Sequence, residues 1–412
     1  MAKFLQNSQR KDSDMKILVL NNGSSSIKYQ LYQMDDRVVL AKGVVERIGS
    51  ESAVLKHQGP AGEAVQVDIN ALDHRQGLKA VMEWLTNPIP GAVSSMEEIT
   101  AIGHRVVHGG EKFQDSTLIT PEVIAGIKAV SHLAPLHNPH NLTGIMICAE
   151  LMPDKPQAAV FDTVFHQTMP PRAYMYALPY RYYKDYGIRK YGFHGTSHKY
   201  VVQRAANLMG KPLGELRIIS CHLGNGASIT AVKGGRSIDT TMGFTPLEGL
   251  MMGTRCGDMD PAIIPFWMEQ GNTSPSELNH LMNDDSGVLG ISGISNDLRD
   301  IEKAAQKGNR RAQLALEMYV YRIQKYIGAY LVTLGGADAI VFTAGVGENQ
   351  SNIRKQICAG LAWLNVQIDD EHNKVRGVEH RISTANSSID VWVIPTNEEL
   401  MIAEETMHLV SK

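Results

Sequence analysis

Two arginines stand among glycines and small polar residues, where a charge on a helix surface would not need to be. Arg105 occurs in GHRVVHGG and Arg255 in GTRCGDMDP. A guanidinium can bind a carboxylate through two parallel hydrogen bonds, and phosphoryl transfer needs positive charge on the oxygens of the migrating group. Both sequences therefore favour an anion site, although a structural ion pair explains either arginine equally well.

Three acidic residues stand at positions where a site could lie. Asp162 follows an apolar stretch in VFDTVFH and could face a site at the end of a strand, or cap the turn that follows. Glu398 and Glu399 come directly after Asn397, a typical first residue of a helix. Their oxygens suit Mg²⁺, but two acids at a helix start also favour the helix dipole.

The 37 glycines of the 412-residue chain suggest sites of close backbone approach. Three glycine turns follow apolar strands, at 21–26, 222–228 and 345–349. Glycine lets backbone N–H groups approach a phosphate closely. None of the turns matches G-x-x-x-x-G-K-[ST] or G-x-G-x-x-G opening a helix, which disfavours those two nucleotide folds. Together the turns predict a nucleotide held between two domains.

Composition and spacing exclude several other classes. The 40 basic and 43 acidic residues give a net charge of −3, which disfavours a dedicated nucleic-acid binder. No apolar run approaches the roughly 20 residues of a membrane span. The four cysteines form no C-x-x-C pair and fit a reducing cytoplasm, and no H-E-x-x-H spacing indicates zinc. Residues 1–14 are polar, and we expect a disordered lead rather than a signal peptide.

The elements that position these residues form two similar sets. Residues 16–20, 27–34 and the segment after Asp36 predict a three-stranded antiparallel meander, and 216–240 repeats this strand–turn–strand pattern. Helices are expected over 72–86, 121–134, 142–152 and 309–334 and after Asn397. The pattern predicts two duplicated α/β domains.

The motifs NNGSSSIKY, GHRVVHGGE, APLHNPHN, YGFHGTSHKY, HLGNGASITAV, TTMGFTPLEGLMMGTRCGDMDP, FTAGVGEN and IPTNEE follow one another along nearly the whole chain. In this order they resemble the acetate kinase family, which is similar in fold to actin, sugar kinases and heat-shock chaperone ATPases. The resemblance implies two duplicated actin-like (ribonuclease H-like) domains with mixed sheets and an interdomain nucleotide cleft. We expect one domain over 15–163 plus 397–412 and the other over 164–396.

The resemblance also implies roles for matching positions. Arg105 holds the acyl carboxylate or phosphate, Asp162 is the catalytic acid residue, and His194 and Arg255 stabilise the migrating phosphoryl group. Asn21 and Glu398 match Mg²⁺ positions, with Mn²⁺ as an alternative ion. The substrate's methyl group meets a small apolar pocket, with a histidine beside it, formed by Val107, Leu136, Phe193, Pro246 and His137. The positions that match segments for ATP or ADP are Ser24, Ser26, Lys28, His222, Leu223, Gly224, Asn225, Gly226, Asp297, Leu298, Arg299, Gly345, Val346, Gly347, Glu348 and Asn349.

The chemistry refines these roles. A carboxylate acceptor is already deprotonated at neutral pH, so catalysis should consist of positioning and charge neutralisation along an in-line path. We therefore expect Asp162 to orient Mg²⁺, an arginine or the acceptor rather than to remove a proton. Val107 bears on substrate choice, because propionate-preferring relatives tend to carry a smaller residue there.

The expected activity is reversible, Mg²⁺-dependent phosphoryl transfer from ATP to acetate, giving acetyl phosphate and ADP, by a cytoplasmic homodimer. One alternative within the enzyme class is a propionate or butyrate kinase. Another is a non-enzymatic nucleotide switch of the actin or chaperone type. Such a switch would share the glycine turns but would need neither arginine nor the methyl pocket.

Overall fold

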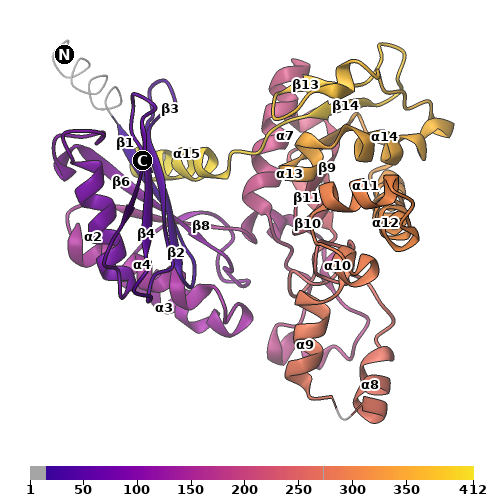
Figure 1. Ribbon diagram of the computed structural model, residues 1–412, viewed down its shortest axis with the longest axis horizontal. Coiled ribbons are helices and arrows are strands. Elements are labelled where there is room, and N and C mark those ends of the chain that lie inside the picture. Colours follow the sequence, from indigo (N-terminus) through magenta and orange to yellow (C-terminus); the bar gives the residue numbers. More distant parts are fainter. Residues whose placement is uncertain (1–14, 272) are drawn as a thin grey trace. The chain divides into compact units, whose positions relative to one another are not determined.

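The computed structural model describes residues 15–271 and 273–412, which divide into two compact units (Figure 1). The first unit comprises residues up to Val164 together with Asn397–Lys412, and the second comprises Phe165–Thr396. The expected lead over 1–14 lies outside the described residues. No helix within the described ranges is long and apolar enough to cross a bilayer.

The first unit is built on an eight-stranded mixed sheet in the order β5-β4-β3-β2-β1-β6-β8-β7. The strands are β1 (Lys16–Asn22), β2 (Ser26–Gln33), β3 (Val38–Glu46), β4 (Val54–Gln58), β5 (Ala64–Asp68), β6 (Ile99–Val106), β7 (Thr117–Leu118) and β8 (Gln157–Phe161). β1 runs parallel to β6 and β6 parallel to β8, so the carboxyl ends of all three lie at the same edge of the sheet.

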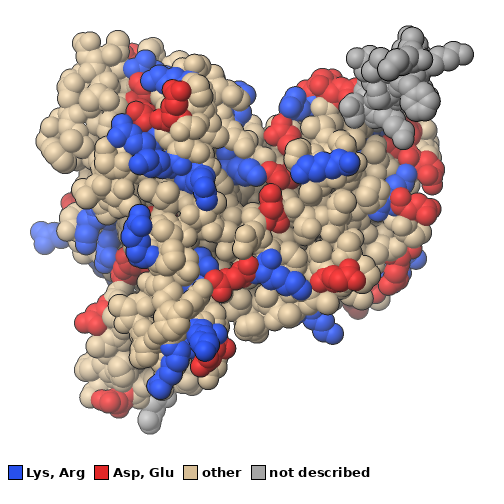
Figure 2. Space-filling view, turned by 180° about the vertical axis from the view of Figure 1, so that it is seen from behind, with Lys and Arg blue, Asp and Glu red and all other residues tan. Residues whose placement is uncertain are grey.

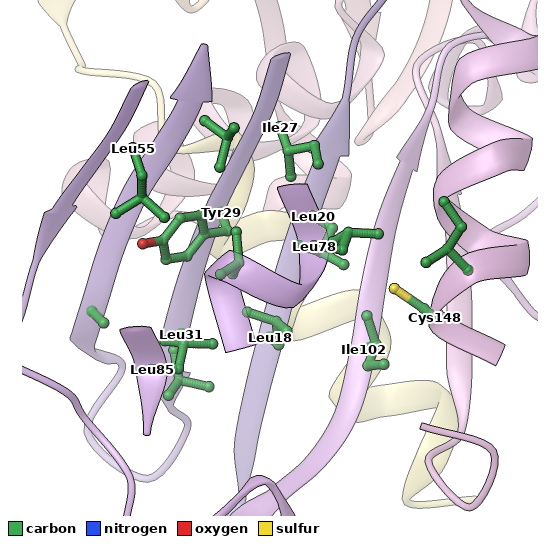
Figure 3. Packing of buried hydrophobic residues seen from close by; sticks show 14 of the residues in the cluster. Leu18, Leu20, Ile27, Tyr29, Leu31, Leu55, Leu78, Leu85, Ile102 and Cys148 are labelled. Atoms are coloured by element: carbon green, nitrogen blue, oxygen red, sulfur yellow. The ribbon is translucent and has the colours of Figure 1, made fainter. Parts of the chain in front are cut away.

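Helices cover both faces of this sheet. On one face lie α2 (His74–Leu85) and α4 (Asn138–Leu151), and α3 (Pro121–Ala129) packs beside α4. Figure 3 shows leucines of β1, β2 and α2 pointing toward one another in this layer. On the other face α15 (Glu398–Val410) packs Ile402 and Ala403 against Ile17 and Val160. Each such fully buried aliphatic side chain contributes about 1.5–3 kcal/mol to stability.

The second unit has a six-stranded mixed sheet in the order β11-β10-β9-β12-β14-β13. Its strands are β9 (Arg217–Leu223), β10 (Ala227–Lys233), β11 (Arg236–Thr240), β12 (Ala339–Thr343), β13 (His380–Arg381) and β14 (Asp390–Val393). The helices around them are α5 (Pro171–Tyr174), α6 (Arg181–Tyr186), α7 (Gly195–Met209), α8 (Ile263–Gly271), α9 (Pro275–Asp284), α10 (Gly287–Ser292), α11 (Leu298–Gln306), α12 (Arg310–Leu334), α13 (Ala344–Asn349) and α14 (Ser351–Ala359).

The two sheets confirm the predicted duplication. The order β3-β2-β1-β6-β8-β7 corresponds strand by strand to β11-β10-β9-β12-β14-β13. The directions agree as well, because each set has two antiparallel pairs, then two parallel pairs, then a final antiparallel pair. The second unit lacks only the extra edge hairpin β4–β5. The fold is therefore an α/β fold used twice.

Two local predictions were wrong. The segment 345–349 is a helix and not the predicted glycine turn, because α13 begins at Ala344, which takes the left-handed backbone conformation (φ 63°) directly after β12. The second helix of the 121–152 region begins at Asn138 rather than near 142, because Pro139 fits the first turn of a helix. The 309–334 helix and the Asn397 cap are confirmed, and the Asn397 side chain accepts from the Leu400 N–H at 3.0 Å.

The surface carries both signs of charge. Lys and Arg side chains are interspersed with Asp and Glu over the face shown in Figure 2. The groups discussed next lie mostly below this surface, at strand ends.

Candidate functional site

In the first unit, the predicted acceptor residues meet at the carboxyl ends of the parallel strands. Arg105 lies near the end of β6, and Asp162 directly follows β8. Arg105 Nε donates to Asp162 Oδ1 at 3.1 Å and Nη2 to Oδ2 at 2.5 Å. The Asp162 side chain is 3% exposed. This two-point ion pair fixes one edge of the guanidinium and leaves N–H groups on Nη1 and Nη2 for another anion.

Asn21 and Glu398 lie within electrostatic reach of this pair. Asn21, near the end of β1, accepts from Arg105 Nη1 at 3.4 Å. Burial raises the pKa of Glu398 to about 7, Arg105 opposes this rise, and Asp162 reinforces it. Burial lowers the pKa of Arg105, but the negative charges of Asp162 and Glu398 outweigh burial and hold it above its usual range.

The first glycine turn places the remaining first-unit residues. Lys28 pairs with Asn21 across β1 and β2 and interacts electrostatically with Glu398. Ser24 is exposed and Ser26 half-buried.

Of the residues proposed for the methyl pocket, Val107 is buried at 5% exposure, whereas Leu136 is 73% exposed and His137 is also exposed.

Two buried asparagines of α4 hold the backbone next to Arg105. Asn141 accepts from the Val107 N–H at 3.1 Å and donates to the Asn22 carbonyl at 2.8 Å. Asn138 accepts from the His108 N–H at 3.0 Å and donates to its carbonyl at 2.9 Å. Sequence reasoning missed both residues. The signal was present in APLHNPHN, where the two asparagines are three residues apart and so share a helix face.

In the second unit, His194 immediately precedes α7 in the left-handed backbone conformation (φ 57°), which is strained for a residue with a side chain. Its Nδ1 lies 2.9 Å from Ser228 Oγ, and its ring stacks on His222 with centroids 4.1 Å apart. The neighbouring Phe193 is buried. Strain of this kind persists only where surrounding contacts hold the residue in place.

Arg255 lies beside the same glycine turn. A Cβ atom on Gly226 would lie 3.3 Å from Arg255 Nη1 and 3.6 Å from His194 Nε2. Arg255 Nη1 donates to the Pro246 carbonyl at 3.2 Å. Burial lowers the pKa of Arg255, although Asp284 opposes the shift. Among the described residues, Arg255 forms no ion pair, so its charge is left for a ligand.

A pocket of about 990 Å³ opens in the second unit. Its lining includes eight of the predicted nucleotide residues, which are Gly224, Asn225, Asp297, Leu298, Arg299, Gly345, Val346 and Asn349. His222, Leu223, Gly226, Gly347 and Glu348 are not in the lining. Sequence reasoning missed several lining residues that carry no glycine or charge signature, including Asn296, Gln350 and Asn352.

The electrostatics of this pocket are local. Asp297 accepts from the Arg299 backbone N–H at 2.9 Å and pairs with its guanidinium, Nη2 to Oδ2, at 2.5 Å. Over the described ranges there is no cluster of three or more His, Cys, Asp or Glu side chains able to cage a metal ion.

Glycine turns on one sheet and an arginine–carboxylate pair on the other are features of a phosphotransferase built on a duplicated α/β fold. Residues 16–404 match the model of the acetokinase family. The chain is 59% identical over 396 residues to the acetate kinase of Halothermothrix orenii, covering 96% of this chain and all of that protein. The chain belongs to the acetokinase family and is a kinase.

Solved structures agree. The acetate kinase of Porphyromonas gingivalis superposes with a TM-score of 0.93 at 48% identity, covering 96% of this chain and all of that one. A propionate kinase from Francisella tularensis superposes with a TM-score of 0.89 at 42% identity, with the same coverage. The fold does not separate the two substrates, so that distinction depends on individual side chains.

Proposed function

We propose that this protein catalyses the reversible transfer of a phosphoryl group from ATP to acetate, giving acetyl phosphate and ADP. The observation that best supports this proposal is the arrangement of Arg105. Asp162 occupies the Nε edge of its guanidinium, and the other edge retains N–H groups. Such a fork binds a planar carboxylate with two hydrogen bonds. The high identity to curated acetate kinases supports the choice of acetate.

The side chains divide the work by charge. Arg105 binds and orients the carboxylate, and Asp162 holds Arg105 in place, since no base is needed to deprotonate acetate. We assign Arg255 and His194 to the oxygens of the migrating phosphoryl group, and their common position beside Gly226 supports this assignment. That transition state is loose, and its charge is spread over three oxygens. It is therefore stabilised by a positive charge that no protein carboxylate neutralises and by neutral hydrogen-bond donors.

Mg²⁺ fits the donor set of the first unit. Asn21 and Glu398 offer oxygen ligands, and burial, with Asp162 and Glu399 nearby, raises the pKa of Glu398 to about 7 although Arg105 and Lys28 oppose the rise. Mg²⁺ commonly binds through one or two carboxylates and completes its shell with water and phosphate oxygens. Bound there, Mg²⁺ or Mn²⁺ would neutralise charge on the nucleotide phosphates.

For the nucleotide we propose the 990 Å³ pocket of the second unit together with the glycine turn 222–228. The turn's backbone N–H groups would face the phosphates and the pocket would take the nucleoside. Transfer then requires the acceptor held by the first unit to meet the γ-phosphate held by the second.

We also propose a cytoplasmic homodimer, which the family resemblance implies. Sedimentation of the purified protein as a monomer would contradict the dimer.

Acyl phosphate trapping tests the activity. The enzyme is incubated with MgATP, hydroxylamine and acetate, propionate or butyrate in turn, and the acyl hydroxamate is measured. We expect acetyl hydroxamate and a higher kcat/KM for acetate than for propionate. Absence of hydroxamate from every acid would contradict the enzyme assignment, and a higher kcat/KM for propionate would contradict acetate as the substrate.

A further inference from the structure

Behind His194 lies a row of buried hydroxyl and imidazole groups to which the reaction above assigns no role. His198 on α7, Ser220 on β9 and Ser228 on β10 are all fully buried. His198 Nδ1 lies 2.8 Å from Ser220 Oγ, and His198 Nε2 lies 2.8 Å from Ser228 Oγ. Ser228 Oγ also lies 2.9 Å from His194 Nδ1. The four side chains are therefore connected by hydrogen bonds in the order Ser220, His198, Ser228, His194.

The number of protons available to this series of hydrogen bonds determines which group donates in each bond. Burial lowers the pKa of His198 well below its usual value, and His166 and His222 lower it further, so the ring is neutral and has one donor and one acceptor nitrogen. Within 15–271 and 273–412, Ser220 Oγ has no hydrogen-bond partner except His198. The buried Ser220 proton is therefore satisfied only if it is donated to His198 Nδ1.

The donor in each of the remaining hydrogen bonds then follows. His198 carries its ring proton on Nε2 and donates it to Ser228 Oγ. Ser228 then donates its single proton to His194 Nδ1, which must be an acceptor. We propose that Ser220, His198 and Ser228 are positioning residues that hold His194 as the neutral tautomer with its proton on Nε2. The opposite direction would leave the Ser220 hydroxyl proton buried without an acceptor, which is unfavourable.

The surroundings of His194 favour the same state. Groups beside His194 include the Arg255 guanidinium, the stacked His222 and, through Ser228, His198. Beyond them, His166 contacts the His198 ring edge-on. The positive charge of Arg255 opposes a second positive charge on the His194 ring. The Nε2 proton of His194 lies on the side of the ring that faces Gly226 and Arg255.

This inference rests on the proposed function for the role of His194 at the phosphoryl group. There a neutral Nε2–H group donates a hydrogen bond without a net charge, while Arg255 supplies the charge. A single tautomer also removes the need to reorganise the ring during transfer, as preorganised donors do at other transition states. His194 should then give the reaction no titration near the ordinary imidazole pKa.

The direct test is ¹⁵N NMR of the full-length enzyme with ¹⁵N-labelled histidine and no substrate. Long-range ¹H–¹⁵N correlations distinguish the two neutral tautomers and the imidazolium, and His194→Gln identifies the His194 signals by their loss. We expect the Nε2–H tautomer from pH 6 to 8. An Nδ1–H tautomer or an imidazolium at pH 7 would overturn the proposal, whether or not the protein makes acyl phosphate.

Ser228→Ala supplies the kinetic test. We expect the His194 signals to shift toward a tautomer mixture, kcat to fall about tenfold with KM for acetate little changed, and a new dependence of kcat on pH to appear near 6.5. The matched control is Thr230→Val, two residues along β10. This substitution removes a buried hydroxyl group whose hydrogen-bond partner is the Thr240 hydroxyl, at 2.9 Å, and not a histidine. The control should keep the wild-type spectrum and pH profile.

Two outcomes would overturn the role of Ser228. One is an unchanged His194 spectrum in Ser228→Ala, and the other is an equal loss of kcat in Thr230→Val. If Ser228→Ala does not fold, Ser220→Ala gives the same test from the other end, because His198 then no longer has a fixed proton position. A His194 spectrum identical to wild type in that variant would contradict the relay.

Discussion

The two units carry arginines in opposite electrostatic settings on the same sheet topology. Arg105 is paired at two points with Asp162 and lies near two further carboxylates, Glu398 and Glu399. Arg255, by contrast, donates to a backbone carbonyl and lies beside a neutral hydroxyl–imidazole network. A compensated guanidinium suits a ground state that must be bound in one orientation. An uncompensated one suits charge that appears only in the transition state.

Arg255→Ala should give the largest effect and would break the comparison if it did not. We expect kcat to fall about 10³-fold with KM for acetate changed much less, because the lost charge acts on the transition state. Steady-state kinetics with hydroxamate detection measure both constants. Arg217→Ala is the matched control, since Arg217 lies at the other end of β9 paired with Asp338. Wild-type kcat in Arg255→Ala would contradict the assignment.

Arg105→Ala should act mainly on binding. We expect KM for acetate to rise about 100-fold with a smaller loss of kcat, because the two-point contact to the carboxylate is lost in the ground state as well. Asp162→Asn should resemble it, since Arg105 would no longer be fixed. A large loss of kcat with an unchanged KM in Arg105→Ala would mean that both arginines serve the transition state and that the contrast is false.

Asn141→Ala tests how the first unit holds its site. The substitution leaves the Val107 N–H and the Asn22 carbonyl buried without partners, so we expect a loss of about 2 kcal/mol in the free energy of unfolding. Urea unfolding measures this loss. Thr143→Ala is the control on the same helix, because the exposed Thr143 hydroxyl bonds only within α4. Equal losses in both variants would exclude a special role for Asn141.

Val107→Ala should sharpen the distinction between acetate and propionate. Removing two methyl groups from a buried position enlarges the space near Arg105, and we expect the propionate-to-acetate ratio of kcat/KM to rise about tenfold. Ala substitution at the exposed Leu136 should change the ratio less. If Leu136 governed the ratio and Val107 did not, substrate choice would be set outside the buried first-unit residues.

Glu398→Gln should give the smallest effect, on stability. Because the folded-state pKa of Glu398 is raised from 4.5 to about 7, its contribution is fully present below pH 4.5 and is lost as pH rises through 7. Glutamine does not titrate, so the variant does not lose stability in this way as pH rises. Without Mg²⁺, the Tm of the variant relative to that of wild type should therefore be about 2 °C higher at pH 8 than at pH 5. Adding MgADP should favour wild type again. A pH-independent Tm difference would contradict the raised pKa.

Much of this fold follows from local sequence. Alternating apolar residues and glycine turns predicted both meanders, and the apolar face of 309–334 predicted the long helix α12. What failed was local as well. The segment 345–349 has the glycines of a turn, yet it folds as helix α13, because Ala344 makes the change of direction and nothing in its residue type signals a positive φ.

The site was predicted less evenly. Charged residues with unusual neighbours, such as Arg105 and Asp162, were found, and the structure brings them into contact. The residues that support the site were not found, because Asn141, which holds the backbone beside Arg105, and Ser228, which bonds His194, are uncharged and common. Their importance comes from partners distant in the sequence, 34 residues away in both cases. Only packing shows which buried hydroxyl or amide has a functional neighbour.

The position of α15 in the chain has a consequence for biosynthesis. This helix covers one face of the first sheet through Ile402 and Ala403, yet it is translated only after the whole of Phe165–Thr396. At about 5–20 residues per second, a ribosome needs roughly 10–50 s to add that segment. Throughout this interval the apolar side chains of Ile17, Val19 and Val160 lack their native cover. The nascent first unit therefore exposes this apolar face until synthesis is nearly finished, and truncation before Glu398 should yield aggregates rather than a folded fragment.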